Sequence, residues 1–305
     1  MTTPFARVSS VRTTRLAPLA IAALVATLMV PSASLAVSPT PATTLAIRYV
    51  VVVMMENRGY DQIVGSPSAP YLNSLIHRYG LATDYTGVAH PSEPNYLAVL
   101  GGSTFGVTDD NVHNIAGTNL LDQLAAKGLT WRVAAEDVPG HCYTGATAYG
   151  GTDGPGWYAR KHEPAISFTD IRTSPTSCAN IENLDAFRPG AANFQLVVPN
   201  FCHDMHDCST ATGDAFLQSW LPRILTSPTF AQTMLVVTWD EGTDNTGGGG
   251  HVATLVINPS VHPGARLASH TSHYSILRSV EDLWGLPCLR NSCGARDLLA
   301  FLHAS

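Results

Sequence analysis

The sequence is poor in positive charge and, beyond its N-terminus, in long apolar runs. It contains 17 lysines and arginines against 23 aspartates and glutamates, which gives a formal net charge of −6. This balance argues against nucleic acid or an anionic lipid surface as a partner bound by bulk charge. After residue 36, no apolar stretch reaches the ~20 residues that a membrane-spanning helix needs, so we expect no stable membrane anchor there.

Several familiar motifs are also missing. There is no Cys-x-x-Cys pair, so a thioredoxin-like centre or a structural zinc site has little support. The glycine run at residues 247–250 is not followed by the Gly-Lys-Ser/Thr of a phosphate-binding loop. Residues 101–105 come nearest to the Gly-x-Ser-x-Gly of a serine esterase but lack its last glycine. These absences disfavour a nucleotide-binding loop and a histidine-activated esterase triad.

The N-terminal segment has the pattern of a secretory signal peptide. Three arginines precede an apolar run over residues 16–30, and a small-x-small cleavage site follows at residues 34–36. A membrane anchor is the alternative, but the run is short and Pro31 ends it. Cleavage would remove three of the 17 cations and none of the 23 acids, moving the formal charge to about −9. We therefore expect a secreted, extracellular protein with a signal peptide at residues 1–36, a flexible leader at 37–46 and a single domain at 47–305.

The six cysteines predict disulfide bonds, because an even number in an exported chain is typical of covalent cross-linking. Fifteen pairings exist. Proximity favours small loops closed by Cys202–Cys208 and Cys288–Cys293, which leaves Cys142 to pair with Cys178.

Strand patterns alternate with helical patterns along the chain. Residues 47–54 are β-branched and nearly all apolar, as expected of a central parallel strand. Further strands are expected over residues 129–135, 194–198, 233–238 and 252–257, and helices over 70–79, 94–100, 120–126, 214–225 and 272–283. The polar residues 142–193 are expected to form a long excursion over the active face. This order predicts an α/β fold with a mostly parallel central sheet and helices on both faces.

Polar side chains follow three of these strands, at the sheet edge where open α/β folds bind ligands. Glu56 and Asn57 follow the first and are good hard-metal ligands, although a solvated turn is the alternative. The loop at residues 203–207 holds two histidines and two aspartates, able to bind phosphate, metal or a proton unless the loop is only structural. Asp240 and Glu241 follow the third, and adjacent acids invite a cation. We expect the glycine run to let His251 approach this site.

Ser92 lies in the turn at residues 90–96. Pro94 favours the start of a helix, so Ser92 is expected at or near the N-cap. Free N–H groups and the positive end of the helix dipole would favour a bound phosphate and a serine alkoxide there. The alternative is that Ser92 only caps the helix. Because acids from several segments converge with it, we interpret Ser92 as the nucleophile of a metal-assisted reaction.

Together these segments resemble the phosphoesterase family, which contains bacterial phospholipases C and acid phosphatases on an alkaline-phosphatase-like fold. The resemblance spans residues 47–287 and is closest to small secreted acid phosphatases of actinobacteria, including a mycobacterial enzyme that acts on phosphatidylinositol 3-phosphate. The similar segments are Glu56-Asn57-Arg58, His90-Pro91-Ser92-Glu93-Pro94-Asn95-Tyr96, Asp204-Met205-His206-Asp207 and Trp239-Asp240-Glu241, with residues 158–162 and 272–274 also alike.

The resemblance implies a role for each candidate residue. Ser92 would be the nucleophile, and His206 would contact the phosphate or donate a proton. A divalent metal, whose identity among Ca, Mg, Mn, Zn and Fe stays open, would be bound by Glu56, Asn57, Ser92, Asp240 and Glu241. Phosphate or substrate contacts are expected from Asp204, His203, Arg160, Lys161, His162, His251 and His273.

We therefore predict that residues 47–305 form the catalytic domain of an acid phosphatase acting on small phosphate esters or phospholipid head groups through a phosphoserine. Two alternatives stay open. A phospholipase C would cut the diester and need room for a large apolar leaving group, whereas a secreted binding protein would use the same fold without turnover. Because a protonated histidine must give its proton to the leaving oxygen, we expect activity to favour acidic pH.

Overall fold

The computed structural model describes residues 10–14, 46–149 and 157–303. The described residues 46–149 and 157–303 belong to the larger of the two units into which the chain divides. The expected signal peptide and leader lie almost entirely outside the described residues and stay predictions. Within the described part of the chain, no helix combines the length and apolarity needed to cross a membrane.

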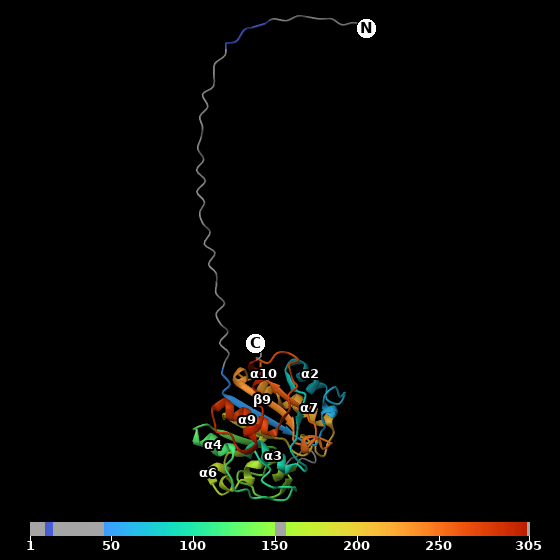
Figure 1. Cartoon of the computed structure of the whole chain (residues 1–305), viewed down its shortest axis with the longest axis vertical. Coiled ribbons are helices and arrows are strands. Elements are labelled where there is room, and N and C mark those ends of the chain that lie inside the picture. The colour runs from blue at the N-terminus through green and yellow to red at the C-terminus, as the bar shows by residue number, and fades with distance from the viewer. Residues whose placement is uncertain (1–9, 15–45, 150–156, 304–305) are drawn as a thin grey trace. The chain divides into compact units, whose positions relative to one another are not determined.

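An eight-stranded sheet runs through the larger unit (Figure 1), in the order β11-β2-β10-β9-β1-β8-β4-β7. Its strands are β1 (Tyr49–Met55), β2 (Gly80–Ala82), β4 (Trp131–Ala135), β7 (Ile181–Asn183), β8 (Phe194–Val198), β9 (Thr233–Trp239), β10 (Thr254–Ile257) and β11 (Arg266–Leu267). The five strands from β9 to β7 are parallel, whereas β10 runs antiparallel to both β9 and β2. The predicted mostly parallel sheet is confirmed, with mixed pairing at one side.

Helices cover both faces of the sheet, as expected (Figure 1). Helices α3 (Glu93–Gly101), α4 (Leu120–Ala126) and α9 (His273–Trp284) lie on one side of β9, and α2 (Pro70–Arg78) and α7 (Thr210–Trp220) lie on the other. The shorter helices are α1 (Tyr60–Ile63), α5 (Thr169–Arg172), α6 (Pro175–Cys178), α8 (Pro222–Leu225) and α10 (Ala300–His303). Because helices cover both faces of the sheet, the central strands are buried on both sides. Residues Val50 to Met55 of β1 and every residue of β9 are buried, which explains their continuous apolar sequences.

Some elements differ from the expectation. The helix expected over residues 214–225 begins earlier, at Thr210, because the Ser209 side chain caps it by accepting a hydrogen bond from the Thr212 N–H. It is also divided in two, and the second helix begins at Pro222. The expected excursion at 142–193 is partly structured. It contains the hairpin β5 (Thr147–Tyr149) and β6 (Trp157–Ala159), the 3₁₀ turn η1 (Arg160–His162) and the edge strand β7.

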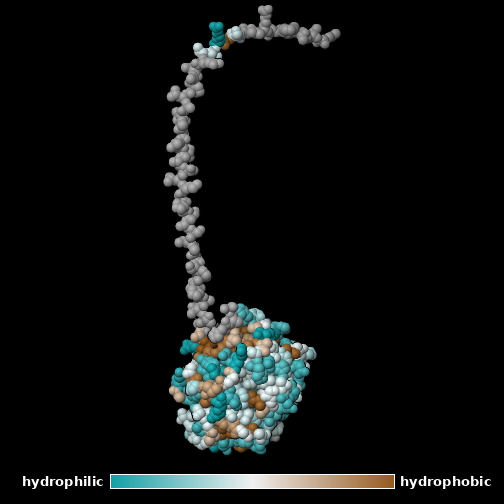
Figure 2. All heavy atoms as spheres, viewed as in Figure 1, coloured by the Kyte–Doolittle hydropathy of each residue, from teal (hydrophilic) through white to brown (hydrophobic). Residues whose placement is uncertain are grey.

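All three disulfides suggested by proximity are present, joining Cys142 to Cys178, Cys202 to Cys208 and Cys288 to Cys293. Exposed large apolar side chains are few, and the surface of the larger unit seen in Figure 2 is mainly hydrophilic or intermediate. The apolar residues are thus mostly used inside the fold.

The glycine run packs tightly against the end of β3 (Tyr85–Thr86). The Gly87 N–H donates to the Gly250 carbonyl at 2.9 Å, and the Gly242 N–H donates to the Gly249 carbonyl at 2.8 Å. A Cβ on Gly249 would lie 2.6 Å from the Gly87 carbonyl carbon and from the Val88 nitrogen. The run therefore allows two backbones to approach closely, beside the segment that carries Asp240.

We expect Gly249→Ala to lower the free energy of unfolding by about 1–3 kcal/mol, because the backbone atoms that the new methyl meets have little room to move. Thermal unfolding of the variant should show a fall in Tm of a few degrees. Gly140→Ala is the matched control, since a Cβ there would meet no described atom within 4 Å. Equal Tm values for the two variants would show that the glycine run is not closely packed.

Candidate active site

The strand register brings three acidic side chains to one edge of the sheet. Met55 pairs with Trp239, so the next residues, Glu56 and Asp240, emerge from neighbouring parallel strands. The Asp240 N–H donates to the Met55 carbonyl at 2.9 Å, and the Glu56 N–H donates to the Asp204 carbonyl at 2.8 Å. The loop after β8 therefore adds Asp204 to the pair. The three segments predicted from the sequence meet because β9, β1 and β8 are adjacent.

These three carboxyl groups are fully buried, and the charge of Asp240 raises the pKa of the other two. Burial raises the pKa of Glu56 well above its usual range, and the charges of Asp240 and Asp204 add to the effect. Burial also raises the pKa of Asp204 strongly. The pKa of Asp240 rises to about 7 through burial and then the neighbouring Glu241 charge. Such a cluster needs either protons or a bound cation to balance its charge.

The donor set fits a divalent cation. Asp204 Oδ2 and Asp240 Oδ2 are buried without a hydrogen-bond partner. His162 Nε2 lies 3.1 Å from Glu56 Oε1 but not in hydrogen-bond geometry, so this buried nitrogen has no hydrogen-bond partner and could face a third group. Ligand atoms of Glu56, His162 and His206 all lie within 4.8 Å of one another. Because burial lowers the pKa of His162 well below its usual range, this imidazole is neutral and able to ligate.

The predicted metal ligands Asn57 and Glu241 lie at the same edge. Asn57 donates its backbone N–H to Asp240 Oδ1 at 3.0 Å and so orients that carboxylate. Glu241 Oε2 is 2.6 Å from His90 Nδ1, and His90 Nε2 is 2.9 Å from the Asp244 carbonyl. One oxygen of Glu241 is thus engaged by His90, a residue to which the sequence analysis gave no role. Metal binding by Asn57 and Glu241 stays a prediction.

Ser92 lies at the N-cap position of α3, yet its side chain does not cap the helix. Its backbone has helical dihedral angles, and its hydroxyl donates to Glu56 Oε2 at 3.0 Å. Asp110 Oδ1 accepts the first free N–H of the helix, that of Glu93, at 3.0 Å. A simple capping role therefore does not describe Ser92, whose hydroxyl is directed into the carboxylate cluster.

Tyr96 is a site residue that the sequence analysis missed. Its buried hydroxyl donates to Glu56 Oε1 at 2.6 Å, and its ring stacks on that of His162 with centroids 5.3 Å apart. Tyr96 thereby holds one oxygen of Glu56 while Ser92 contacts the other. Its spacing of four residues from Ser92, on one face of a helix, was the available signal.

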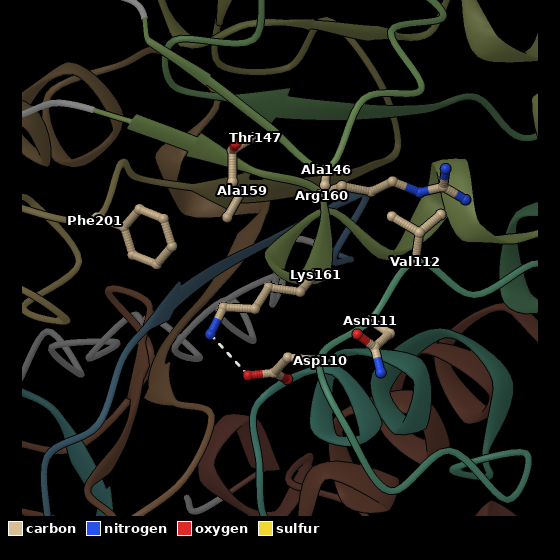
Figure 3. Close-up of a pocket in the computed structure, with 9 residues that line it drawn as sticks. All are labelled: Asp110, Asn111, Val112, Ala146, Thr147, Ala159, Arg160, Lys161 and Phe201. Carbon is tan, nitrogen blue, oxygen red and sulfur yellow. Dashed lines mark hydrogen bonds and ion pairs between the residues drawn. The ribbon is translucent and has the colours of Figure 1, made fainter.

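Lys161 and His206 lie on the more exposed side of the cluster. Lys161 Nζ is 2.8 Å from Asp110 Oδ2, the pair drawn in Figure 3, and 3.4 Å from His206 Nε2. The His206 Nδ1 atom is 2.7 Å from Asp207 Oδ1. His206 and Lys161 side chains are 25% and 17% exposed, whereas Glu56 and Asp204 are at 0%. The site therefore opens toward Lys161 and His206.

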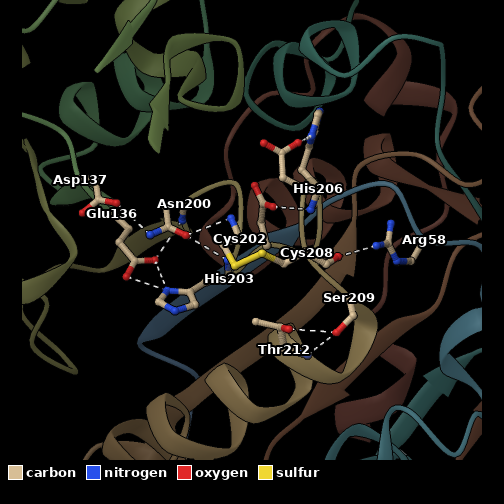
Figure 4. Close-up of a disulfide and its surroundings, with 12 residues drawn as sticks. Arg58, Glu136, Asp137, Asn200, Cys202, His203, His206, Cys208, Ser209 and Thr212 are labelled. Atoms are coloured by element: carbon tan, nitrogen blue, oxygen red, sulfur yellow. Dashed lines mark hydrogen bonds and ion pairs between the residues drawn. A yellow bond between two sulfur atoms is a disulfide. The ribbon is translucent and has the colours of Figure 1, made fainter. Parts of the chain in front are cut away.

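A disulfide loop holds Asp204 and His206 in place (Figure 4). Cys202 and Cys208 close the ring, and Asp204 Oδ1 accepts the His206 backbone N–H at 2.7 Å inside it. Arg58 donates to the Cys208 carbonyl at 2.7 Å and so ties the loop to the end of β1. His203 points to the other side, where Nδ1 lies 2.9 Å from both Glu136 oxygens. Its predicted substrate contact stays a prediction.

The structure records other partners for three further predicted residues. The Arg160 guanidinium donates to the Thr144 and His113 carbonyls at 2.9 and 2.8 Å. The His251 ring stacks on Tyr60, and its Nε2 is 3.0 Å from the Thr83 carbonyl. His273 bridges the Tyr85 hydroxyl and the Asp240 carbonyl, which supports the strand end behind the cluster. Substrate contacts by Arg160, His251 and His273 likewise stay predictions.

The chain is similar in sequence to known phosphatases. The family model described as "Phosphoesterase family" matches residues 66–287. The chain is 35% identical to the phosphatidylinositol-3-phosphatase of Mycobacterium tuberculosis, over 85% of this chain and 82% of that protein. It is 30% identical to an acid phosphatase of Aspergillus fumigatus, over 81% of this chain but only 57% of the length of that relative.

Solved structures share the fold at low sequence identity. A protein of the alkaline phosphatase superfamily from Vibrio parahaemolyticus superposes with a TM-score of 0.55 at 12% identity, covering 81% of this chain and 70% of that one. The phosphonate monoester hydrolase of Agrobacterium radiobacter gives a TM-score of 0.53 at 12% identity, covering 85% and 77% of the two chains. The expected alkaline-phosphatase-like architecture is confirmed.

We expect a divalent cation to stabilise the folded protein, by a margin that grows as the pH rises from about 4 to about 7. Without metal, carboxyl groups whose pKa is raised in the folded state hold protons that the unfolded chain releases. Their contribution to the stability of the folded state is therefore present at low pH. It is lost as the pH rises through the folded-state pKa. Tm should be measured with EDTA and with saturating Mn²⁺ or Zn²⁺; a gain of about 5–10 °C near neutral pH corresponds to about 2–3 kcal/mol of binding linkage.

Asp204→Asn should remove most of this gain, because it takes away a ligand charge. Asp185→Asn changes an exposed acid that is not part of the cluster and serves as the control. The metal interpretation fails if the gain is absent at every pH, or if it is as large in Asp204→Asn as in the unaltered protein.

Proposed function

Since the chain belongs to the phosphoesterase family, we propose that this phosphoric ester hydrolase cleaves phosphate monoesters at the site around Ser92, through a phosphoserine. The observation that carries the proposal is the hydrogen bond from the Ser92 hydroxyl to Glu56, in place of a helix cap. A serine aimed at buried carboxylates, beside a lysine and a histidine on the open side, has the groups that phosphoryl transfer needs.

The roles of the residues follow from their contacts. Ser92 Oγ attacks phosphorus while Glu56, its hydrogen-bond acceptor, receives the hydroxyl proton. The bond from phosphorus to the alcohol oxygen breaks, and protonated His206 gives its proton to that oxygen. Water then attacks the phosphoserine, His206 takes a proton from the water, and Ser92 recovers its own from Glu56. Phosphate and alcohol leave, and the enzyme returns to its starting state.

A bound metal ion and the Lys161 side chain would balance the negative charge of the carboxylates and the phosphate. Glu56, His162, Asp204 and Asp240 are the residues that would hold a divalent metal, joined by Asn57, Glu241 and Ser92 as predicted ligands. When bound, such a cation supplies a Lewis acid that favours the Ser92 alkoxide and the charge developing on the phosphoryl oxygens. Lys161 contributes a fixed positive charge on the open side, where it binds and orients the phosphate.

The proposal also covers the class of substrate and the secretion of the protein. A relative named phosphatidylinositol-3-phosphatase and others named acid phosphatase support small phosphate esters or phospholipid head groups as substrates. The signal-like N-terminus and three disulfides support secretion to an oxidising, extracellular environment.

Ser92→Ala should lower kcat for p-nitrophenyl phosphate by about a thousandfold or more, because no other hydroxyl replaces the nucleophile. Tm should stay near that of the unaltered protein, and inorganic phosphate should still bind by calorimetry. Ser74→Ala, which changes an exposed serine on α2, is the control. Full phosphatase activity in Ser92→Ala would overturn the assignment of the nucleophile.

Lys161→Met should move the alkaline limb of the kcat profile to higher pH by about one unit. Burial, and then the Lys161 charge, lower the pKa of His206, so removing that charge raises the pKa and keeps the acid protonated to higher pH. KM should rise as well, since the phosphate loses a cation. Lys127→Met, at the exposed C-cap of α4, should leave both quantities unchanged. If the alkaline limb does not move in Lys161→Met, His206 is not the acid.

A further inference from the structure

Asp110 joins two parts of the site that lie on different segments of the chain. Its Oδ1 atom accepts the backbone N–H of Glu93, the first residue of α3, at 3.0 Å, and its Oδ2 atom lies 2.8 Å from the Lys161 ammonium. Glu93 directly follows Ser92, whereas Lys161 belongs to η1. One carboxylate therefore connects the helix start beside the proposed nucleophile with the cation that is proposed to bind the phosphate.

The loop that carries Asp110 is itself attached to Glu93 by a second contact. His113 Nδ1 lies 2.6 Å from Glu93 Oε2, and the Ser167 hydroxyl donates to Glu93 Oε1 at 3.1 Å. Glu93 is buried, and both its backbone N–H and its carboxylate are bonded by residues of this one loop. Asp110 thus has a fixed position from which it can hold another group.

Lys161 is the group that such a carboxylate can fix, because a lysine side chain is long and flexible. Asp110 and Lys161 both line the hollow drawn in Figure 3, where a dashed line joins the two side chains. The Lys161 Nζ atom also lies 3.4 Å from His206 Nε2, on the open side of the site. An ammonium group has three N–H donors, so the bond to Asp110 leaves donors for a phosphate and limits the directions in which they point.

We propose that Asp110 is a positioning residue, whose carboxylate fixes the Lys161 ammonium relative to Ser92 so that the ammonium meets the phosphoryl group in the transition state. The inference rests on the proposed function and adds a residue to it. Charge that is already in place lowers the barrier because it needs no rearrangement during the reaction. A displacement of about 1 Å can cost on the order of a hundredfold in rate. Asp110 need not touch the substrate, since its effect on the rate passes through Lys161.

A double-mutant cycle between Asp110 and Lys161 tests this proposal. Asp110→Asn keeps an oxygen that can accept the Glu93 N–H, but it removes the charge that holds the ammonium. We expect kcat for p-nitrophenyl phosphate to fall about tenfold, while KM and the inhibition constant of inorganic phosphate rise by less than about twofold, because the cation is still present. In the Lys161→Met background, the same substitution should lower kcat by less than about twofold, because no ammonium is left to position.

Asp109→Asn is the matched control, because Asp109 precedes Asp110 in the same loop, carries the same charge and lies 3.2 Å from His113 Nε2. This variant should keep kcat within about twofold of that of the unaltered protein. Asp110→Glu still presents a carboxylate to Lys161 and should recover part of the activity that Asp110→Asn loses. It also provides a second variant if Asp110→Asn folds poorly, which thermal unfolding would show.

An equal fall in kcat in the two backgrounds, or a loss in Asp109→Asn as large as that in Asp110→Asn, would overturn the inference and leave Asp110 a structural role. A rise in kcat/KM on removal of the Asp110 charge would also overturn it, because the carboxylate would then compete with the phosphate for Lys161. Failure of the proposed function is separate, since full activity in Ser92→Ala would contradict it whatever the cycle shows.

Discussion

The repulsion among three carboxylates buried at the ends of adjacent strands is the constraint on which the site depends. Glu56, Asp204 and Asp240 are brought together by strand register, not by attraction, so the fold must compensate their charge. Tyr96 and Ser92 donate to Glu56, and the Asn57 backbone donates to Asp240. Asp204 Oδ2 and Asp240 Oδ2 have no hydrogen-bond partner, and the unsatisfied charge that would weaken an isolated fold would provide binding energy for a cation.

Much of this could be predicted from the sequence, because the signal was local. Strands buried on both faces appear as continuous apolar runs, and parallel strands end at the same edge, so Glu56, Asp204 and Asp240 were expected to converge. The two short disulfide loops followed from proximity along the chain. A serine before a helix-starting proline at Pro94 marked the position of Ser92, although its contact with Glu56 depended on packing.

Contacts that join distant loops could not be predicted in this way. Asp110 caps α3 and pairs with Lys161, yet it lies in a loop without periodicity, and nothing local marks its partners. The substrate contact expected of His162 stays a prediction, but its position between Glu56 and Asp204 could not be read from the sequence. The partners of polar side chains such as those of His203 and His251 are set only by the folded arrangement. His203 contacts Glu136 and stacks on Phe216, and His251 stacks on Tyr60.

The Cys202–Cys208 ring has a consequence for when the protein becomes active. It encloses Asp204 and His206, so two members of the site are carried by a loop whose closure is a covalent oxidation. A newly made chain in a reducing cytoplasm lacks that closure, and the loop is then tied down only by weaker contacts such as that of Arg58. On the proposed secretory route, closure of the ring and completion of the site would therefore coincide with entry into an oxidising compartment.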